Sequence, residues 1–148
     1  MNPAHAHLIL NHLPLFGALF VAALMAVSVA RKSSELARVA LYFAVATSLL
    51  AIPTFITGQY SEEIAESLPE VSEFFIEDHE DAALFALVAL EACGVLALVG
   101  LVVHRQGDIP RWLAISVLVG LIISFGLTVW TANLGGQIRH TETRSDFR

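Results

Sequence analysis

Residues 82–103 read AALFALVALEACGVLALVGLVV, and this stretch decides the fold class. It contains one charged side chain, Glu91, and no proline. A helix of about 20 apolar residues crosses the roughly 30 Å hydrocarbon core of a bilayer. Backbone groups in lipid must be satisfied internally, and a helix does this within one segment. The stretch therefore predicts a transmembrane helix.

Three further apolar stretches have similar lengths. Spans are predicted at 8–30, 36–56, 82–103 and 112–132. Their apolar runs are continuous rather than alternating, which favours helices over barrel strands. The 148 residues are 56% hydrophobic and 15% charged, whereas soluble domains carry about 25% charged residues. We expect an all-α fold: one integral membrane domain over 1–148, built as a four-transmembrane-helix bundle.

The basic residues predict the orientation. Five of them lie in or next to the two short loops: Arg31, Lys32, Arg38, Arg105 and Arg111. The connection 58–81 contains no Lys or Arg. The positive-inside rule then places the basic loops in the cytoplasm and both termini in the periplasm. We expect a multi-pass protein of the bacterial inner membrane.

The connection between the second and third spans carries an apolar stripe. Ile64, Leu68, Val71 and Phe75 recur at helical spacing within 60–77. This pattern predicts one or two short amphipathic helices on the membrane interface.

Charge and cysteine content narrow the function classes. The formal net charge of −6 argues against nucleic-acid binding. The single cysteine, Cys93, lies in an apolar run and has no partner for an intramolecular disulfide. The sequence shows no nucleophile–base constellation and no phosphate-binding loop, so it leaves open whether the protein is an enzyme.

Imidazoles and carboxylates gather at the predicted periplasmic rim. The residues that the topology brings there are His5, His7, His12, His79, His140, Glu62, Glu66, Glu77, Glu80 and Glu142. Imidazole ligates haem iron, and imidazole with carboxylate ligates other transition metals. The plainer interpretation is a set of interfacial histidines, with acidic residues favoured by the dipole at a helix start.

The first histidine segment contains His7 and His12. Residues five apart point about 140° apart on a regular helix, so these two would not chelate one ion from it. Pro14 disturbs the preceding turn, which either re-aims His12 or marks the helix start with Asn11 as N-cap.

The second and third histidine segments flank spans three and four. Glu77 and Glu80 share a helical face, with His79 between them. Gly135 and Gly136 allow a backbone or a flat ring to approach closely. Of the residues that follow, Arg139 is able to bind a propionate through two parallel bonds. We expect the imidazoles of three spans to share one pocket, namely those of His12, His79 and His140.

Glu91 lies near the middle of the third span. A carboxylate there costs roughly 2.5–3.5 kcal/mol on the insertion scale, so such residues usually face the bundle interior and have a role. Thr47, Ser48 and Ser124 lie at similar depth. Both a proton path and an interhelical hydrogen bond from a protonated carboxyl remain open.

Together these segments resemble an uncharacterised bacterial family of small four-helix membrane proteins. The shared motifs are His7, His12-Leu-Pro14, Thr57-Gly58, Ile76-Glu-Asp-His-Glu80 and Gly135-Gly-Gln-Ile-Arg-His-Thr-Glu142. The chain departs from the pattern directly after His7, where it lacks the proline that follows the first histidine in the family. Fusion of family members to Rieske or c-type cytochrome domains implies redox work.

Three functions remain open. The first is a b-type haem protein for electron transfer, with His12 and His79 as axial ligands and His7 and His140 as further ligands or supports. In it Gly135 and Gly136 make room for the ring and Arg139 meets a propionate. The second is a non-haem iron, copper or zinc site held by the set His7, His12, His79, His140, Glu77, Glu80 and Glu142. The third is an assembly subunit of a larger membrane complex. Expected partners are lipid, other redox membrane or periplasmic proteins, and a further copy of the chain.

Overall fold

The computed structural model describes residues 2–69, 71 and 73–144. Within them lie six α-helices and a short 3₁₀ helix: α1 (Pro3–Leu10), α2 (His12–Arg31), α3 (Ser34–Gln59), α4 (Glu62–Glu66), α5 (Glu73–Val103), α6 (Arg111–Arg139) and η1 (Thr141–Thr143). The described residues contain no strand. The predicted all-α fold is confirmed.

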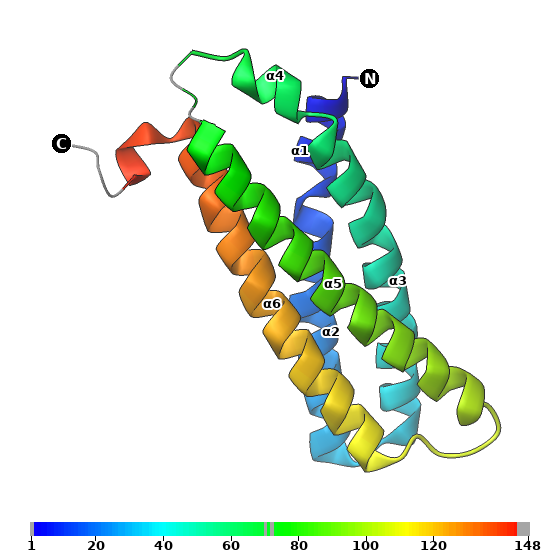
Figure 1. Ribbon diagram of the computed structural model, residues 1–148. Helices are drawn as coiled ribbons and strands as arrows, with labels where there is room; N and C mark the ends of the chain where they lie inside the picture. Colours follow the sequence, from blue (N-terminus) through cyan, green and yellow to red (C-terminus); the bar gives the residue numbers. More distant parts are fainter. Residues whose placement is uncertain (1, 70, 72, 145–148) are drawn as a thin grey trace.

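Four helical stretches, 3–31, 34–59, 73–103 and 111–139, are long and apolar enough to cross a membrane. The chain is therefore a multi-pass membrane protein. Figure 1 shows α2 and α5 running in one direction and α3 and α6 in the other. Each of these helices packs on two neighbours: α3 lies between α2 and α5, and α6 lies between α5 and α2. The result is a four-helix bundle.

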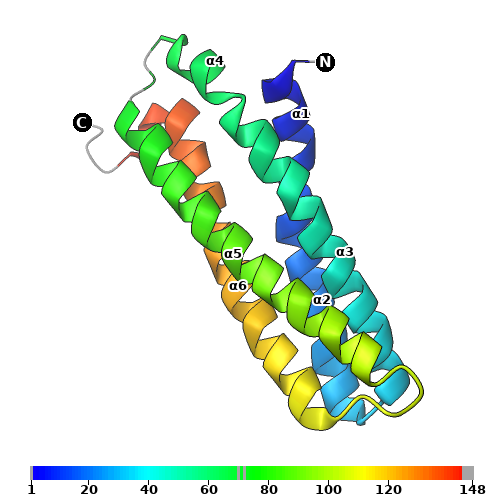
Figure 2. The ribbon, with the colours of Figure 1, turned by 45° about the vertical axis from the view of Figure 1, so that its right-hand side comes forward.

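The bundle has two chemically different ends. The histidine end holds α1, α4, the start of α5 and the end of α6, and the basic end holds the α2–α3 turn and the α5–α6 connection. Seen from the side in Figure 2, the α5–α6 backbone lies apart from that of α1 and α3 toward the histidine end. There α4 lies between the end of α3 and the start of α5.

The helices extend beyond the predicted spans. Helix α5 begins at Glu73, well before Ala82, so Phe75 belongs to it rather than to a separate amphipathic helix. Among the described residues of the 60–77 segment, α4 is the one short helix. The first span consists of two helices, α1 and α2, which meet at Asn11, where the backbone keeps helical angles (φ −58°, ψ −24°). Asn11 occupies the N-cap position of α2, as one of the two interpretations expected, but its side chain makes no cap hydrogen bond.

Local sequence signals fix the helix ends. The Asn2 side chain accepts a hydrogen bond from Ala4 N at 2.9 Å, ahead of Pro3 at the start of α1. Lys32 ends α2 with a left-handed φ of 54°. Ser33 then caps α3 by accepting from Leu36 N at 3.2 Å. The turn is therefore short enough to keep α2 and α3 antiparallel neighbours.

The core is narrow because small residues dominate the helix seams. A side chain at Gly17 would meet Thr47, and one at Gly120 would meet the Cys93 sulfur. Large apolar side chains instead cover the outside, including Phe20, Phe85 and Ile123, each more than half exposed. Burial of small residues with large apolar ones outside is the arrangement expected when lipid surrounds the bundle.

The two halves of the chain repeat one another. The buried residues of α2 are Pro14, Ala18, Val21, Ala22, Met25 and Ser28. Adding 72 to each number gives buried residues of α5: Ala86, Leu90, Cys93, Gly94, Ala97 and Gly100. Adding 77 to five buried positions of α3 (37, 40, 44, 47 and 51) gives buried positions of α6 (114, 117, 121, 124 and 128). The bundle is thus two similar helical hairpins with an approximate two-fold axis along its length.

Candidate histidine site

His7 lies on α1 against the end of α3. Its Nδ1 is 3.0 Å from the carbonyl oxygen of Thr54. The ring lies beside Gly58, where an added Cβ would be 3.0 Å from the His7 Cε1 atom. In an α-helix the carbonyl of residue i points toward the N–H of residue i+4. A ring therefore reaches the Thr54 carbonyl from the side because residue 58 has no side chain.

His79 makes the same arrangement in the second hairpin. It lies near the start of α5, with its Nδ1 2.9 Å from the carbonyl oxygen of Thr131 on α6. The ring lies beside Gly135, where a Cβ would be 2.9 Å from the His79 Cε1 atom. Thr131 and Gly135 are again four residues apart. The positions His7 and His79 differ by the same 72 that relates the buried faces of α2 and α5, and Thr54 and Thr131 differ by 77.

These contacts show that Nδ1 of each ring carries a proton. A carbonyl oxygen only accepts hydrogen bonds, so Nδ1 of each ring carries the proton and donates it. The Nε2 atom of a neutral ring then has a free lone pair. Neither Nε2 has a hydrogen-bond partner among the residues that the structure describes. A donor bond from the other ring nitrogen is the usual support for an imidazole that ligates a metal.

The two rings influence each other electrostatically. A positive charge on His7 acts unfavourably on a charged His79, and both rings are partly buried. Hairpin one thus supplies one imidazole and hairpin two supplies the other. The His7 ring lies against Gly58 and the His79 ring against Gly135, both at the histidine end of the bundle.

The other predicted histidines lie elsewhere. His12 is exposed, and its ring stacks on that of Phe16 at a centroid distance of 6.1 Å. Phe16 is itself 60% exposed, so this pair lies on the outer surface of α2. The sequence predicts that His12 pairs with His79. The ring whose charge reaches His79 is instead that of His7, since residues five apart on a helix point to different sides.

His5 and His140 are also exposed. His140 Nδ1 lies 3.0 Å from Glu142 Oε1, and both side chains are more than half exposed. The pKa of Glu142 lies below its usual value. The main cause is a hydrogen bond from the backbone N–H of Glu142 to its own carboxylate, and the second cause is the hydrogen bond with His140. Of Glu77, Glu80 and Glu142, only Glu142 is hydrogen-bonded to a histidine among the described residues. The groups that orient His7 and His79 are backbone carbonyls.

The predicted carboxylates form a separate acidic cluster. Glu62, Glu66 and Asp81 lie close enough to Glu80 for their charges to act on its carboxyl. This cluster links α4 to α5. Glu77 is exposed. Within residues 2–69, 71 and 73–144, no group of three or more His, Cys, Asp or Glu side chains is arranged to hold a metal ion.

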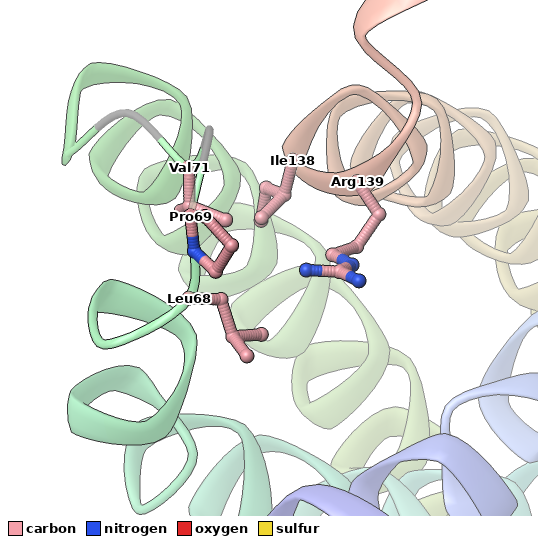
Figure 3. A pocket seen from close by; sticks show the side chains of 5 residues that line it. All are labelled: Leu68, Pro69, Val71, Ile138 and Arg139. Atoms are coloured by element: carbon pink, nitrogen blue, oxygen red, sulfur yellow. The ribbon is translucent and has the colours of Figure 1, made fainter.

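Of the glycine pair after span four, only Gly135 touches a histidine. A Cβ added at Gly136 would meet nothing within 4 Å. Arg139 follows Gly135 by one turn and lines an open pocket of about 370 Å³ with Leu68, Pro69, Val71 and Ile138. Figure 3 shows its guanidinium directed across this pocket toward Leu68. Arg139 thus places a cation one helical turn beyond Gly135, the residue beside the His79 ring.

Sequence reasoning missed Gly58 and both threonine carbonyls as parts of the site. The signal was present as two Thr-x-x-x-Gly motifs, each near the end of the second helix of a hairpin that opens with a histidine. Comparisons with protein-family models, with curated proteins and with solved structures gave no match.

Proposed function

We propose that this chain is a membrane electron-transfer protein that binds one b-type haem at its histidine end, with Nε2 of His7 and of His79 as the axial ligands. The observation that carries the proposal is the pair of equivalent imidazoles, each oriented by a carbonyl and a glycine of the helix that follows it in its hairpin. Haem iron takes two axial imidazoles, and the approximate two-fold axis relates the two that the chain offers.

The surroundings suit the same cofactor. Gly58 and Gly135 give the rings room, and Arg139 offers a guanidinium near the site for a haem propionate. Bound haem would supply reversible one-electron chemistry. The protein's own contribution is to engage Nδ1 of both imidazoles with carbonyls, which leaves Nε2 as the ligating atom, and to surround the rings with apolar helices. The donor set favours haem over a non-haem ion, which normally needs three or more protein ligands.

The orientation belongs to this proposal. Five of the eight Lys and Arg residues lie at the basic end. We place that end in the cytoplasm and the histidine end at the periplasmic side of a bacterial inner membrane. Electron donors or acceptors would then be membrane or periplasmic redox proteins.

Absorption spectra test the function. Protein expressed with added haem precursor and purified in mild detergent should show a Soret band and one haem per chain. His7→Ala and His79→Ala should each lose most of the band, and His12→Ala, which alters an exposed ring, should keep it. Colourless protein with near-stoichiometric iron, copper or zinc would favour the non-haem site. Colourless, metal-free and stable protein would favour an assembly subunit.

A further inference from the structure

The basic end of the bundle carries positive charge that the histidine site does not use. Residues 31–38 and 104–112 contain five basic side chains and two acidic ones, Glu35 and Asp108. The histidine end has the opposite balance, because residues 60–81 and 135–144 contain ten acidic side chains and two basic ones. The two ends therefore present opposite charge to whatever surrounds them.

Two polar contacts hold the α5–α6 connection against the start of α3. Arg38 donates to the carbonyl oxygens of His104 and Gly107. The Ile109 N–H donates to the Ser34 Oγ atom at 2.8 Å. The α2–α3 turn directly precedes Ser34, and both connections lie at the same end of the bundle (Figure 1). Their basic residues are thus gathered on one surface.

Four of the five cations at this end are exposed: Arg31, Lys32, Arg105 and Arg111. Their side chains make no hydrogen bond or ion pair with any described part of the chain. Arg38 differs from them, because its guanidinium is bound to the two carbonyls of the connection. The other four charges are available to an anion outside the protein.

These cations border the lipid-facing surface of the bundle. Exposed apolar side chains lie within four residues of them on three helices: Val27, Val103 and Ile115. Trp112, which directly follows Arg111, is 63% exposed. Tryptophan side chains gather at the level of the lipid headgroups. The basic groups therefore lie at the edge of the hydrocarbon, at the depth of lipid phosphates.

We propose that the basic end is a binding surface for phospholipids with a net negative headgroup, with Arg31, Lys32 and Arg111 as the side chains that bind the phosphate. These three come within three residues of the two ends of the Ser34–Ile109 bond. Each Lys or Arg near an anionic lipid surface raises binding about fivefold. A zwitterionic lipid gains less, because its phosphate carries its own cation.

The two tryptophans of the chain allow the two ends to be measured separately. Trp112 and Trp130 are 18 residues apart on α6, about 27 Å along the helix axis and close to the roughly 30 Å thickness of the hydrocarbon. Fluorescence of Trp130→Phe protein therefore reports on lipid at the basic end. Fluorescence of Trp112→Phe protein reports on lipid toward the histidine end.

Quenching by brominated lipids in vesicles of equal parts phosphatidylglycerol and phosphatidylcholine tests the proposal. Bromine is placed on the acyl chains of one lipid or of the other. Trp112 should be quenched more strongly by brominated phosphatidylglycerol than by brominated phosphatidylcholine, and Trp130 should show no such preference. About 0.5 M salt should reduce the preference at Trp112, because it screens the charges.

Variants in the Trp130→Phe background assign the preference to the basic side chains. Replacing Arg31, Lys32 and Arg111 together by Gln should abolish it. Arg139→Gln removes one cation from the other end and should leave it unchanged. If the triple variant folds poorly, Lys32→Gln alone should lower the relative binding of phosphatidylglycerol by up to about fivefold.

Three results would overturn the proposal. The first is equal quenching of Trp112 by the two brominated lipids. The second is a preference that survives the triple variant, or an unchanged preference in Lys32→Gln where the triple variant does not fold. The third is a preference of the same size at Trp130, because the basic end would then have no special affinity for the anionic lipid.

Discussion

A histidine ring from a neighbouring helix reaches the carbonyl of a helical residue from the side only where the residue four positions further along that helix has no side chain. Gly58 and Gly135 occupy these positions, and a histidine ring lies where the Cβ of each would be. Ala at either position should push the ring off its carbonyl and lower haem affinity by about 10–100-fold, as for other groups that orient metal ligands. Haem titration measures this. Gly136→Ala is the matched control, because its Cβ would meet nothing within 4 Å. Equal losses for all three variants would contradict the role given to the two glycines.

Acid should release the haem, because a protonated imidazole cannot coordinate iron. Free histidine side chains protonate with a pKa of about 6.5, so the Soret band should weaken as pH falls below about 6 and return on neutralisation. Glu142→Gln should leave this profile unchanged. The pKa of Glu142 is lowered by its own backbone N–H and by His140, so this exposed group stays charged through that range. A shifted profile in Glu142→Gln would bring His140 back into the site.

At the scale of helices, Arg38 is the main polar connection at the basic end. Its Nη2 donates to the carbonyl oxygens of His104 at 2.9 Å and Gly107 at 2.6 Å, which joins α3 to the α5–α6 connection. Arg38→Ala should lower the free energy of unfolding by about 1–3 kcal/mol, since it removes charged hydrogen bonds. Denaturant unfolding in detergent measures it, with the exposed Arg105→Ala as control. A lost Soret band in folded Arg38→Ala would contradict the separation of the two ends.

The sequence predicted the helices well because hydropathy alone specifies a span in lipid. It placed His79, Gly135 and Arg139 at one end of the bundle correctly. It named His12 rather than His7 as the partner of His79, because the two point to different sides of a helix and hydropathy does not show which side faces α3. The internal repeat was also hidden, since equivalent buried positions hold different residues, such as Met25 with Ala97 and Ser28 with Gly100. Only burial in the folded bundle makes them comparable.

At the scale of the whole molecule, the orientation follows from where the basic residues lie. In a Cys93→Ala background, Ser67→Cys at the histidine end should label with an impermeant thiol reagent from the periplasm. Gln106→Cys at the basic end should label only after the membrane is opened. Both positions are exposed. The reverse labelling pattern would place the histidine end in the cytoplasm.

The central claim is that each hairpin supplies one imidazole to a single haem, and ligand rescue tests it most directly. Wild-type protein titrated with haem should bind one per chain and give a six-coordinate, low-spin spectrum. His7→Gly and His79→Gly should each give a five-coordinate, high-spin spectrum that added imidazole returns to six-coordinate, and the double variant should lose haem. Six-coordinate spectra in both single variants without imidazole, or the same loss in His12→Gly, would contradict the account.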